Sequence, residues 1–305
     1  MTDKNTLKDN NETQKPECDR VKPDEPRKKG LINGIKSRIR CAKRRLFKDK
    51  DVALVKIDGI IMDSTNFPVA KKVIKALKEV ENREIKTLVI RINSPGGTVG
   101  ASQEIYNAIE RLKAKDTLIV ASCGEVCASG GVYIASACSK IVANPGTITG
   151  SIGVIIKSSS FKALYEKIGI ASEVIKSGPY KDILSSHRLL TDEEKELLQG
   201  MIDNTYNQFV DVVARGRNID HNIVKTFADG RIFTGEQALE YGMIDKMGSL
   251  KDAIYYAAEL AGIEEEPNVV DVSPKKSMFS QMVSSRMQNI ELMTEYSGVP
   301  LWLMP

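Results

Sequence analysis

The regular alternation of strand-like and helix-like segments between residues 51 and 262 constrains the fold of this chain more than any other feature. Such alternation predicts an α/β fold, with a mostly parallel sheet flanked by helices. A chain of 305 residues with 42% apolar content can bury the core of one such domain. The expected strands are 53–57, 86–92, 117–121, 140–143 and 152–156. The expected helices are 69–80, 101–112, 129–137, 161–167, 192–215, 234–241 and 250–261.

The helix expected at 192–215 has the clearest local signals. Thr191 and Glu194 have the spacing of a capping box at its start. One face carries a stripe that we expect to pack on the core, made of Leu198, Ile202, Thr205, Phe209 and Val212.

Residues 127–133 (Cys-Ala-Ser-Gly-Gly-Val-Tyr) place Ser129 among small residues, within a run that has no charge from Val126 to Ser139. A serine in this setting can be a nucleophile, and the amide that follows it can hold an oxyanion. A small-residue contact between a buried helix and a sheet explains the same residues. This stretch alone leaves both interpretations open.

Two further segments favour a catalytic site. The strand expected at 86–92 runs into residues 93–97 (Asn-Ser-Pro-Gly-Gly), a turn whose amides can bind an anion. Downstream, the loop 177–182 carries Lys181, although a lone loop lysine is usually only a solvated surface residue.

Five motifs in a fixed order then resemble the short form of signal peptide peptidase A, a serine protease family of the crotonase-like (Clp protease-like) superfold. The resemblance covers about residues 51–262. The motifs are 93–97 (Asn-Ser-Pro-Gly-Gly), 128–131 (Ala-Ser-Gly-Gly), 149–153 (Thr-Gly-Ser-Ile-Gly), 177–182 (Ser-Gly-Pro-Tyr-Lys-Asp) and 229–235 (Asp-Gly-Arg-Ile-Phe-Thr-Gly).

The resemblance implies a serine endopeptidase with a Ser-Lys dyad that hydrolyses apolar peptides such as cleaved signal peptides. By position, Ser129 matches the nucleophile and Lys181 the general base. Gly97 and Gly130 would supply oxyanion amides, and Ser151 would position the lysine. The resemblance implies no metal or other cofactor, and a homo-oligomeric ring with sites shared between subunits. The alternative is a crotonase-like acyl-CoA enzyme or a non-catalytic scaffold of the same fold.

The distribution of titratable residues also favours a lysine base. The chain has two histidines, His187 and His221, which we expect at the surface, and residues 149–156 contain no titratable side chain. A solvated lysine with a pKa of about 10.4 is neutral in roughly one molecule in 2,500 at pH 7, a cost of about 4.6 kcal/mol. We therefore expect Lys181 to be buried against apolar residues such as 154–156 and 183–184, with the Asp182 side chain directed away.

The cysteines indicate reduced core residues rather than a disulfide framework or a zinc site. Their number is odd, and the Cys123/Cys127 spacing is wrong for a zinc-binding pair. The five are Cys18, Cys41, Cys123, Cys127 and Cys138.

The amino-terminal segment, residues 1–50, differs from the rest in composition. It holds sixteen Lys/Arg against eight Asp/Glu, and residues 27–48 carry ten basic side chains and no acidic one beside a ragged apolar stripe. We favour an anionic membrane surface as its partner over a solvated linker, and both over nucleic acid, because no aromatic residues are interleaved with the charge.

The remaining expectations concern location and boundaries. The amino terminus has no apolar run of about 18 residues, so we expect neither a transmembrane helix nor a signal peptide. A cytoplasmic location, or a peripheral one on the cytoplasmic face of the membrane, follows. We expect residues 1–50 as a disordered and basic amphipathic segment, 51–262 as the protease domain, and 263–305 as a connector with an apolar tail.

The tail, residues 297–305, holds the only tryptophan. It can pack on its own domain, touch lipid, or lie in the peptide groove as a product-like ligand. We favour packing on a neighbouring surface.

Overall fold

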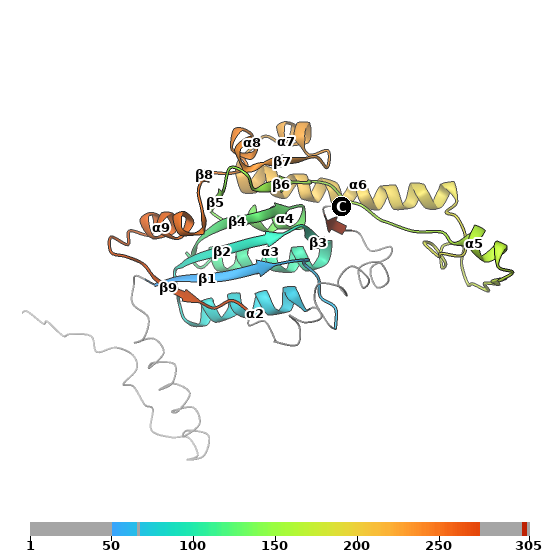
Figure 1. Ribbon diagram of the computed structural model, residues 1–305, viewed down its shortest axis with the longest axis horizontal. Helices are drawn as coiled ribbons and strands as arrows, with labels where there is room; N and C mark the ends of the chain where they lie inside the picture. The colour runs from blue at the N-terminus through green and yellow to red at the C-terminus, as the bar shows by residue number, and fades with distance from the viewer. Residues whose placement is uncertain (1–50, 66–67, 275–300, 304–305) are drawn as a thin grey trace, which may run out of the picture. The chain divides into compact units, whose positions relative to one another are not determined.

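A sheet of eight strands forms the centre of the structure, a computed structural model that describes residues 51–65, 68–274 and 301–303 (Figure 1). Its strand order is β7-β6-β4-β2-β1-β9, and β5 pairs with both β4 and β8. Every pairing in this described sheet is parallel except β6–β7, which confirms the predicted α/β fold with a mostly parallel sheet. The strands are β1 (Asp51–Asp58), β2 (Thr87–Ser94), β4 (Leu118–Ala128), β5 (Lys140–Ala143), β6 (Ile148–Gly150), β7 (Ile232–Thr234), β8 (Lys246–Met247) and β9 (Asn268–Asp271).

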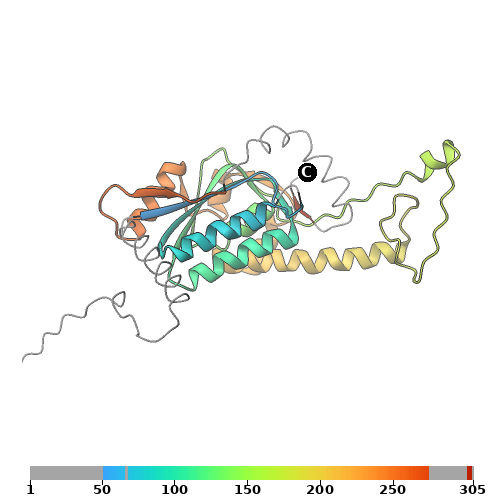
Figure 2. The ribbon, with the colours of Figure 1, turned by 90° about the horizontal axis from the view of Figure 1, so that it is seen from below.

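Helices cover both faces of the sheet. On one face α2 (Val69–Asn82) and α3 (Val99–Lys113) lie side by side, and α4 (Gly130–Ala135) packs against α3 (Figure 2). On the other face α9 (Leu250–Leu260) buries its alanines against valines and a leucine from β1, β2, β4 and β5. Strands buried on both faces read as continuous apolar runs, which is why the sequence marks them clearly.

One predicted strand, 152–156, is wrong. The strand lies earlier, at β6, and Ser151 leaves it with a positive φ of 52°. After this turn the chain runs out of the sheet, so the apolar residues 154–156 are only half-buried.

Between β6 and the longest helix lies a segment that we call the arm, residues 157–191. It contains α5 (Lys162–Lys167) and leads into α6 (Asp192–Arg217). Both views show the part around α5 beyond the far end of α6, away from the sheet (Figures 1 and 2). The α6 capping box of Thr191 and Glu194 is present, as predicted.

Only the carboxyl-terminal half of α6 packs extensively on the core. Phe209 and Val212 are buried there, as predicted, and so is Leu198 near the start of the helix, whereas the predicted stripe residues Ile202 and Thr205 are half-buried. The amino-terminal half, most of whose residues are exposed, carries the arm away from the sheet.

The remaining described elements include two strands outside the main sheet. β3 (Gly96–Thr98) follows β2 and pairs antiparallel with β10 (Leu301–Leu303). The two other helices are α7 (His221–Phe227) and α8 (Gly235–Glu240). β9 lies beyond residue 262, so the sheet extends past the domain boundary expected there.

The expectations for residues 1–50, including the basic segment 27–48, fall outside the described part of the chain. Within the described ranges, no helix is both long and apolar enough to cross a bilayer.

Candidate active site

Ser129 occupies the turn between β4 and α4. Its φ of 51° and ψ of −115° lie outside the helical region, so α4 begins at Gly130 and not at 129 as predicted. A non-glycine residue held at positive φ costs on the order of 1–3 kcal/mol and is common at functional sites. The Ser129 hydroxyl is buried and has no hydrogen-bond partner among the described residues. Such a hydroxyl remains available to a reacting group.

Gly97 lies in β3, which passes very close to the backbone at Ile61. A Cβ atom built on Gly97 would stand 1.8 Å from the Ile61 carbonyl oxygen, so only glycine fits. The Thr98 amide donates to the Ile61 carbonyl, and the Ile61 amide donates to the Gly96 carbonyl. Because polar groups alternate along a strand, the Gly97 amide faces the opposite edge of β3.

Gly130 is the first residue of α4, so its amide has no acceptor within the helix. The next residue, Gly131, would bring a Cβ to 3.3 Å from the Ser94 carbonyl oxygen. The start of α4 therefore lies close to the end of β2, with little room for a side chain at residue 131. The Gly-Gly pair therefore lets the Ser129 turn lie beside the turn that carries Gly97.

Ser151 is placed by strand register. Ala128 of β4 pairs with Gly150 of β6, so Ser129 and Ser151 follow two paired residues. The Ser151 amide donates to the carbonyl of Arg231 at 2.8 Å, and this hydrogen bond stabilises the turn at Ser151. This contact explains the motif at 229–235, whose contribution here is a main-chain oxygen. Nothing in the sequence indicated that role.

The structure thus brings Ser129, Gly97, Gly130 and Ser151 together at the carboxyl ends of β2, β4 and β6. In parallel α/β sheets this edge is where ligands usually bind. Lys181 is not among them, because it lies in the arm and is exposed in the single chain. The expected burial of Lys181 against apolar residues is therefore not met within one subunit.

Asp182, next to Lys181, is bound by other cations. Arg188 donates to its carboxylate at 2.7 and 2.9 Å, and Lys176 donates at 2.6 Å. Hydrogen bonds from Arg188 and then from Lys176 hold the pKa of Asp182 far below its ordinary value. This agrees with the expectation that the Asp182 side chain is directed away from the Lys181 amine.

Arg188 also ties the arm to α6. It donates to Glu194 at 2.7 Å, and Glu194 is buried and accepts from the Thr191 amide. The bond from Arg188 is the main reason that the pKa of Glu194 falls to about 2. The turn that carries Lys181 is therefore fixed to the helix by an ionic network.

Both histidines reach the surface, His187 exposed and His221 half-buried. His187 is an exposed arm residue stacked on Tyr165 at 4.9 Å. His221 begins α7 and pairs with Asp211 at 3.1 Å.

The three cysteines in the described part, Cys123, Cys127 and Cys138, are buried free thiols, as predicted. Burial raises the pKa of Cys138 to about 12, so its thiol stays protonated. Cys18 and Cys41 lie outside the described residues.

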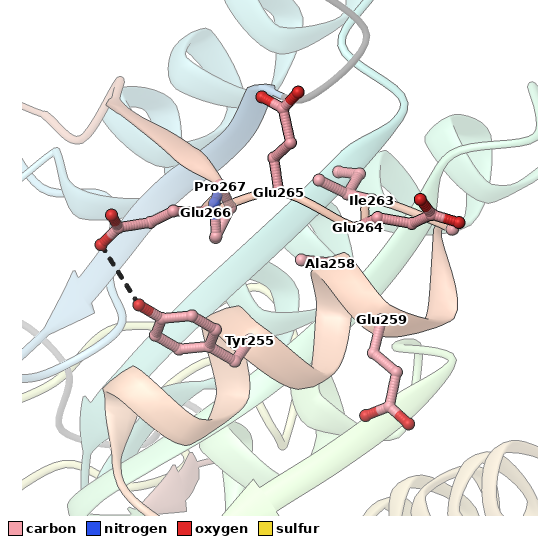
Figure 3. Close-up of a pocket in the computed structure, with 9 residues that line it drawn as sticks. Tyr255, Ala258, Glu259, Ile263, Glu264, Glu265, Glu266 and Pro267 are labelled. Atoms are coloured by element: carbon pink, nitrogen blue, oxygen red, sulfur yellow. Dashed lines mark hydrogen bonds between the residues drawn. The ribbon is translucent and has the colours of Figure 1, made fainter.

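A separate acidic hollow lies beside α9 (Figure 3). Tyr255 donates to Glu266 at 3.3 Å, while the carboxylates of Glu259, Glu264 and Glu265 point in different directions. The hollow precedes β9, whose first residue pairs with the first residue of β1. It therefore lies at the opposite edge of the sheet from Ser129. Across residues 51–65, 68–274 and 301–303, no group of three His, Cys, Asp or Glu side chains has the arrangement of a metal site.

Sequence comparison identifies the family. The family description Peptidase family S49 matches residues 111–264, and Clp protease matches residues 43–147. A protein of Synechocystis sp. that is named as a protease is 46% identical over 270 residues, covering 83% of this chain and 96% of that protein. A protein of Enterococcus faecium named as signal peptide peptidase SppA is 36% identical, covering 68% of this chain and 62% of that protein.

Solved structures support the same fold. A variant of the 1510-N membrane-bound stomatin-specific protease in complex with a substrate peptide superposes with a TM-score of 0.52 at 18% identity, covering 78% of this chain and 98% of that one. The match to the peptidase family and the relatives named as proteases favour a peptidase over the acyl-CoA enzyme or scaffold considered as alternatives. The chain therefore belongs to peptidase family S49 and is a serine protease of the Clp protease-like (crotonase-like) fold.

Proposed function

We propose that the chain is an endopeptidase in which Ser129 is the nucleophile and Lys181 of a neighbouring subunit is the general base. The observation that carries the proposal is the convergence at one sheet edge of a buried Ser129 hydroxyl, the Gly97 turn and Ser151. The exposed position of Lys181 in the arm supports its donation to another subunit.

In this mechanism the neutral amine of Lys181 takes the proton of the Ser129 hydroxyl as the oxygen attacks the scissile carbonyl carbon. The amides of Gly97 and Gly130 donate to the oxyanion that forms. The protonated lysine then gives its proton to the leaving amine as the C–N bond breaks. Water, deprotonated by the same lysine, then attacks the acyl ester. The lysine returns that proton to the Ser129 oxygen as the ester C–O bond breaks, which releases the acid and regenerates Ser129 and the neutral amine.

The arm presents the kind of surface that an assembly would bury. Ile175 is 96% exposed and Leu189 is 70% exposed, which is unusual for aliphatic side chains gathered on one short segment. Other exposed apolar residues of the arm are Phe161, Leu164, Ile168, Ile170, Val174 and Tyr180. A homo-oligomeric ring would cover this surface with a second copy of the chain.

Assembly would also meet the requirement of a lysine base. Ser129 is already buried, so a lysine amine that reaches it from a partner leaves bulk water. Desolvation favours the neutral amine. Ser151, beside Ser129, would then orient that amine by a hydrogen bond.

For the substrate we propose extended apolar peptides, such as cleaved signal peptides. The relative from Enterococcus faecium is named as a signal peptide peptidase, which supports this class.

The test is labelling with a fluorophosphonate probe, which requires a reactive serine. Wild-type protein should label and Ser129→Ala should not. Ser136→Ala is the matched control, because Ser136 is buried at the end of α4 and its hydroxyl donates to the Val132 carbonyl at 2.8 Å. Equal labelling of Ser129→Ala would refute the assigned nucleophile.

We also propose that residues 27–48 bind anionic membrane on its cytoplasmic face. The support is the sequence, with ten basic and no acidic side chains beside an apolar stripe. The full chain should sediment with anionic vesicles at low salt, and less so as salt rises. Neutral vesicles are the control, and equal binding to both would contradict an electrostatic contact.

A further inference from the structure

Strand β4 contains a bulge shortly before the residue proposed as the nucleophile. Ile92 of β2 pairs with Cys123, but Ser94 pairs with Cys127, so three residues of β4 lie where β2 has only Asn93. β4 therefore has two extra residues at this point. Because each residue advances a strand by about 3.3 Å, the bulge displaces the end of β4 by roughly 7 Å relative to β2.

The bulge sets the level of the nucleophile along β2. After the bulge Ser129 lies level with Gly96, since each is two positions beyond the Ser94–Cys127 pair. If the register before the bulge continued, Ser129 would lie level with Thr98 instead. The register shift therefore decides how far the nucleophile reaches along the turn that carries the proposed oxyanion amide.

The side chain of Asn93 occupies the space that the bulge opens. Its Oδ1 accepts from the Val126 amide at 3.1 Å. A Cβ built on Gly124 would stand 2.7 Å from the same Oδ1, so the lack of a side chain at Gly124 makes room for Asn93. Of the atoms in an asparagine amide group only the oxygen can accept. One side chain of β2 thus bonds to the backbone of β4 three residues before Ser129.

Two threonines hold the same stretch of β4 from the side of β6. The Thr147 hydroxyl donates to the Gly124 carbonyl at 2.8 Å, and the Thr149 hydroxyl donates to the Cys127 carbonyl at 2.7 Å. Both threonines are buried. A bulge interrupts the ladder between strands, and here side chains supply hydrogen bonds to its backbone. Asn93 makes this kind of contact from β2.

We propose that Asn93 is a positioning residue for the Ser129 nucleophile and acts through the Val126 amide. The inference rests on the proposed function, which assigns the nucleophile and the oxyanion amides. Ser129 has a φ of 51°, a conformation that the surrounding structure must impose. The bond from Val126 ties the segment leading into this turn to β2, the strand that continues towards Gly97. Without it the hydroxyl would shift relative to the oxyanion amides, and a displacement of about 1 Å can cost on the order of a hundredfold in rate.

The first experiment compares two substitutions that keep the size of Asn93. Asn93→Asp keeps an acceptor oxygen, and Arg91, on the same face of β2, can offset the added charge. Asn93→Leu has no acceptor. Per site titrated to completion with the fluorophosphonate probe, Asn93→Leu should lower kcat about a hundredfold and leave KM nearly unchanged. Asn93→Asp should remain near wild type, and equal kcat values for the two variants would overturn the proposal.

Ile109→Val separates positioning from a general loss of stability. Ile109 is fully buried in α3, ten positions beyond the first residue of that helix and so about 15 Å along it from the Gly97 strand. The smaller side chain should lower Tm, and kcat per titrated site should stay at the wild-type value. A fall in kcat as large as that of Asn93→Leu would show that instability alone explains the loss, and the positioning role would be refuted.

A second variant reaches the same hydrogen bond from β4, and it tests the proposal even if Asn93→Leu does not fold. Gly124→Ala would place a Cβ within 2.8 Å of three atoms of the Asn93 side chain and displace it. Its kcat per titrated site should fall. Gly146→Ala is the matched control, because no atom lies within 4 Å of the new Cβ. Equal kcat values in the two glycine variants would contradict the role of Asn93.

Amide hydrogen exchange, resolved to single residues by mass spectrometry, tests the contact without turnover. In Asn93→Leu the amides of Val126 and Ser129 should exchange about tenfold faster than in wild type, and in Asn93→Asp they should not. If wild-type protein neither hydrolyses peptide nor labels at Ser129, the proposed function fails, and exchange at Ser129 still decides whether Asn93 holds its turn. If wild type is active and Asn93→Leu matches it in kcat and in exchange, the positioning role fails and the peptidase assignment stands.

Discussion

The main-chain amide of Ser129 donates a hydrogen bond of 2.8 Å to the carbonyl oxygen of Gly150. This bond joins the ends of β4 and β6 where the two strands stop. The residue after Gly150, Ser151, has a φ of 52°, almost the value of 51° at Ser129. Two neighbouring strands therefore end in two serine turns of the same hand, and the site lies between them.

Ser129→Ala should abolish peptide hydrolysis without lowering Tm. The substitution removes a buried hydroxyl that has no partner in the described structure, so no folded-state hydrogen bond is lost. Turnover and thermal unfolding measure the two effects. Residual turnover above about a thousandth of wild type would point to another nucleophile.

Ser122→Ala is the stability control. Its buried hydroxyl accepts from Arg91 at 2.9 Å, so its loss should cost about 1 kcal/mol. If Ser129→Ala lowered Tm as much as Ser122→Ala does, the Ser129 hydroxyl would have to make a hydrogen bond in the folded protein, contrary to the structure.

Gly97→Ala should destabilise the protein by about 3 kcal/mol or more and abolish activity. The new Cβ would overlap the backbone of Ile61, which cannot move aside as a flexible side chain can. Denaturant unfolding measures the change. Gly100→Ala, where no atom lies within 4 Å of the new Cβ, should instead be neutral or stabilising by about 0.5 kcal/mol. Similar losses in both variants would show that the close approach is not the cause.

Lys181→Arg should be as inactive as Lys181→Ala, because arginine keeps its charge and cannot act as a base. Lys167→Arg, elsewhere in the arm, is the matched control and should keep full activity. Substantial activity in Lys181→Arg would reduce the lysine to an electrostatic role.

Mixing Ser129→Ala with Lys181→Ala subunits should restore activity if the dyad is shared. In a head-to-tail ring with random exchange, about a quarter of the sites pair an intact serine with an intact lysine. The assay is peptide hydrolysis after mass spectrometry has verified subunit exchange. No recovery would refute sharing while leaving the dyad itself intact.

Arg188→Gln should loosen the arm at neutral pH and loosen it less in acid. The folded-state pKa values of Asp182 and Glu194 are lowered, that of Glu194 to about 2, chiefly by Arg188. Groups of this kind stabilise the fold fully above their ordinary pKa of about 4. Their contribution decreases as pH falls towards the folded-state pKa, and that of Glu194 is mostly lost by pH 2, whereas that of Asp182 persists to lower pH.

Hydrogen exchange in the arm, corrected for intrinsic rates, checks this from pH 7 to pH 2.5. The difference in corrected exchange rate between wild type and Arg188→Gln should narrow as pH falls. Lys195→Gln, which removes an exposed pair with Asp192, should show no gap. A gap that stays constant down to pH 2.5 would exclude the two carboxylates as its source.

The sequence by itself determined the parts of the protein that depend on short-range patterns. Continuous apolar runs marked the central strands, because strands buried on both faces need apolar residues throughout. The Thr191–Glu194 capping box fixed the start of α6 for an equally local reason. The order of the motifs identified the family, which the comparisons confirmed.

Tertiary structure decided what depends on distant segments. Residues 152–156 are as apolar as a strand, yet the Ser151 turn, held by the Arg231 carbonyl, takes them out of the sheet. Gly97 must be glycine because Ile61 passes beside it, and Leu301–Leu303 form a strand because β3 has an edge to receive them. The part of the arm around α5 lies away from the sheet because α6 extends away from the core. The periodicity of a helix predicts its length but not the direction in which it leaves the sheet.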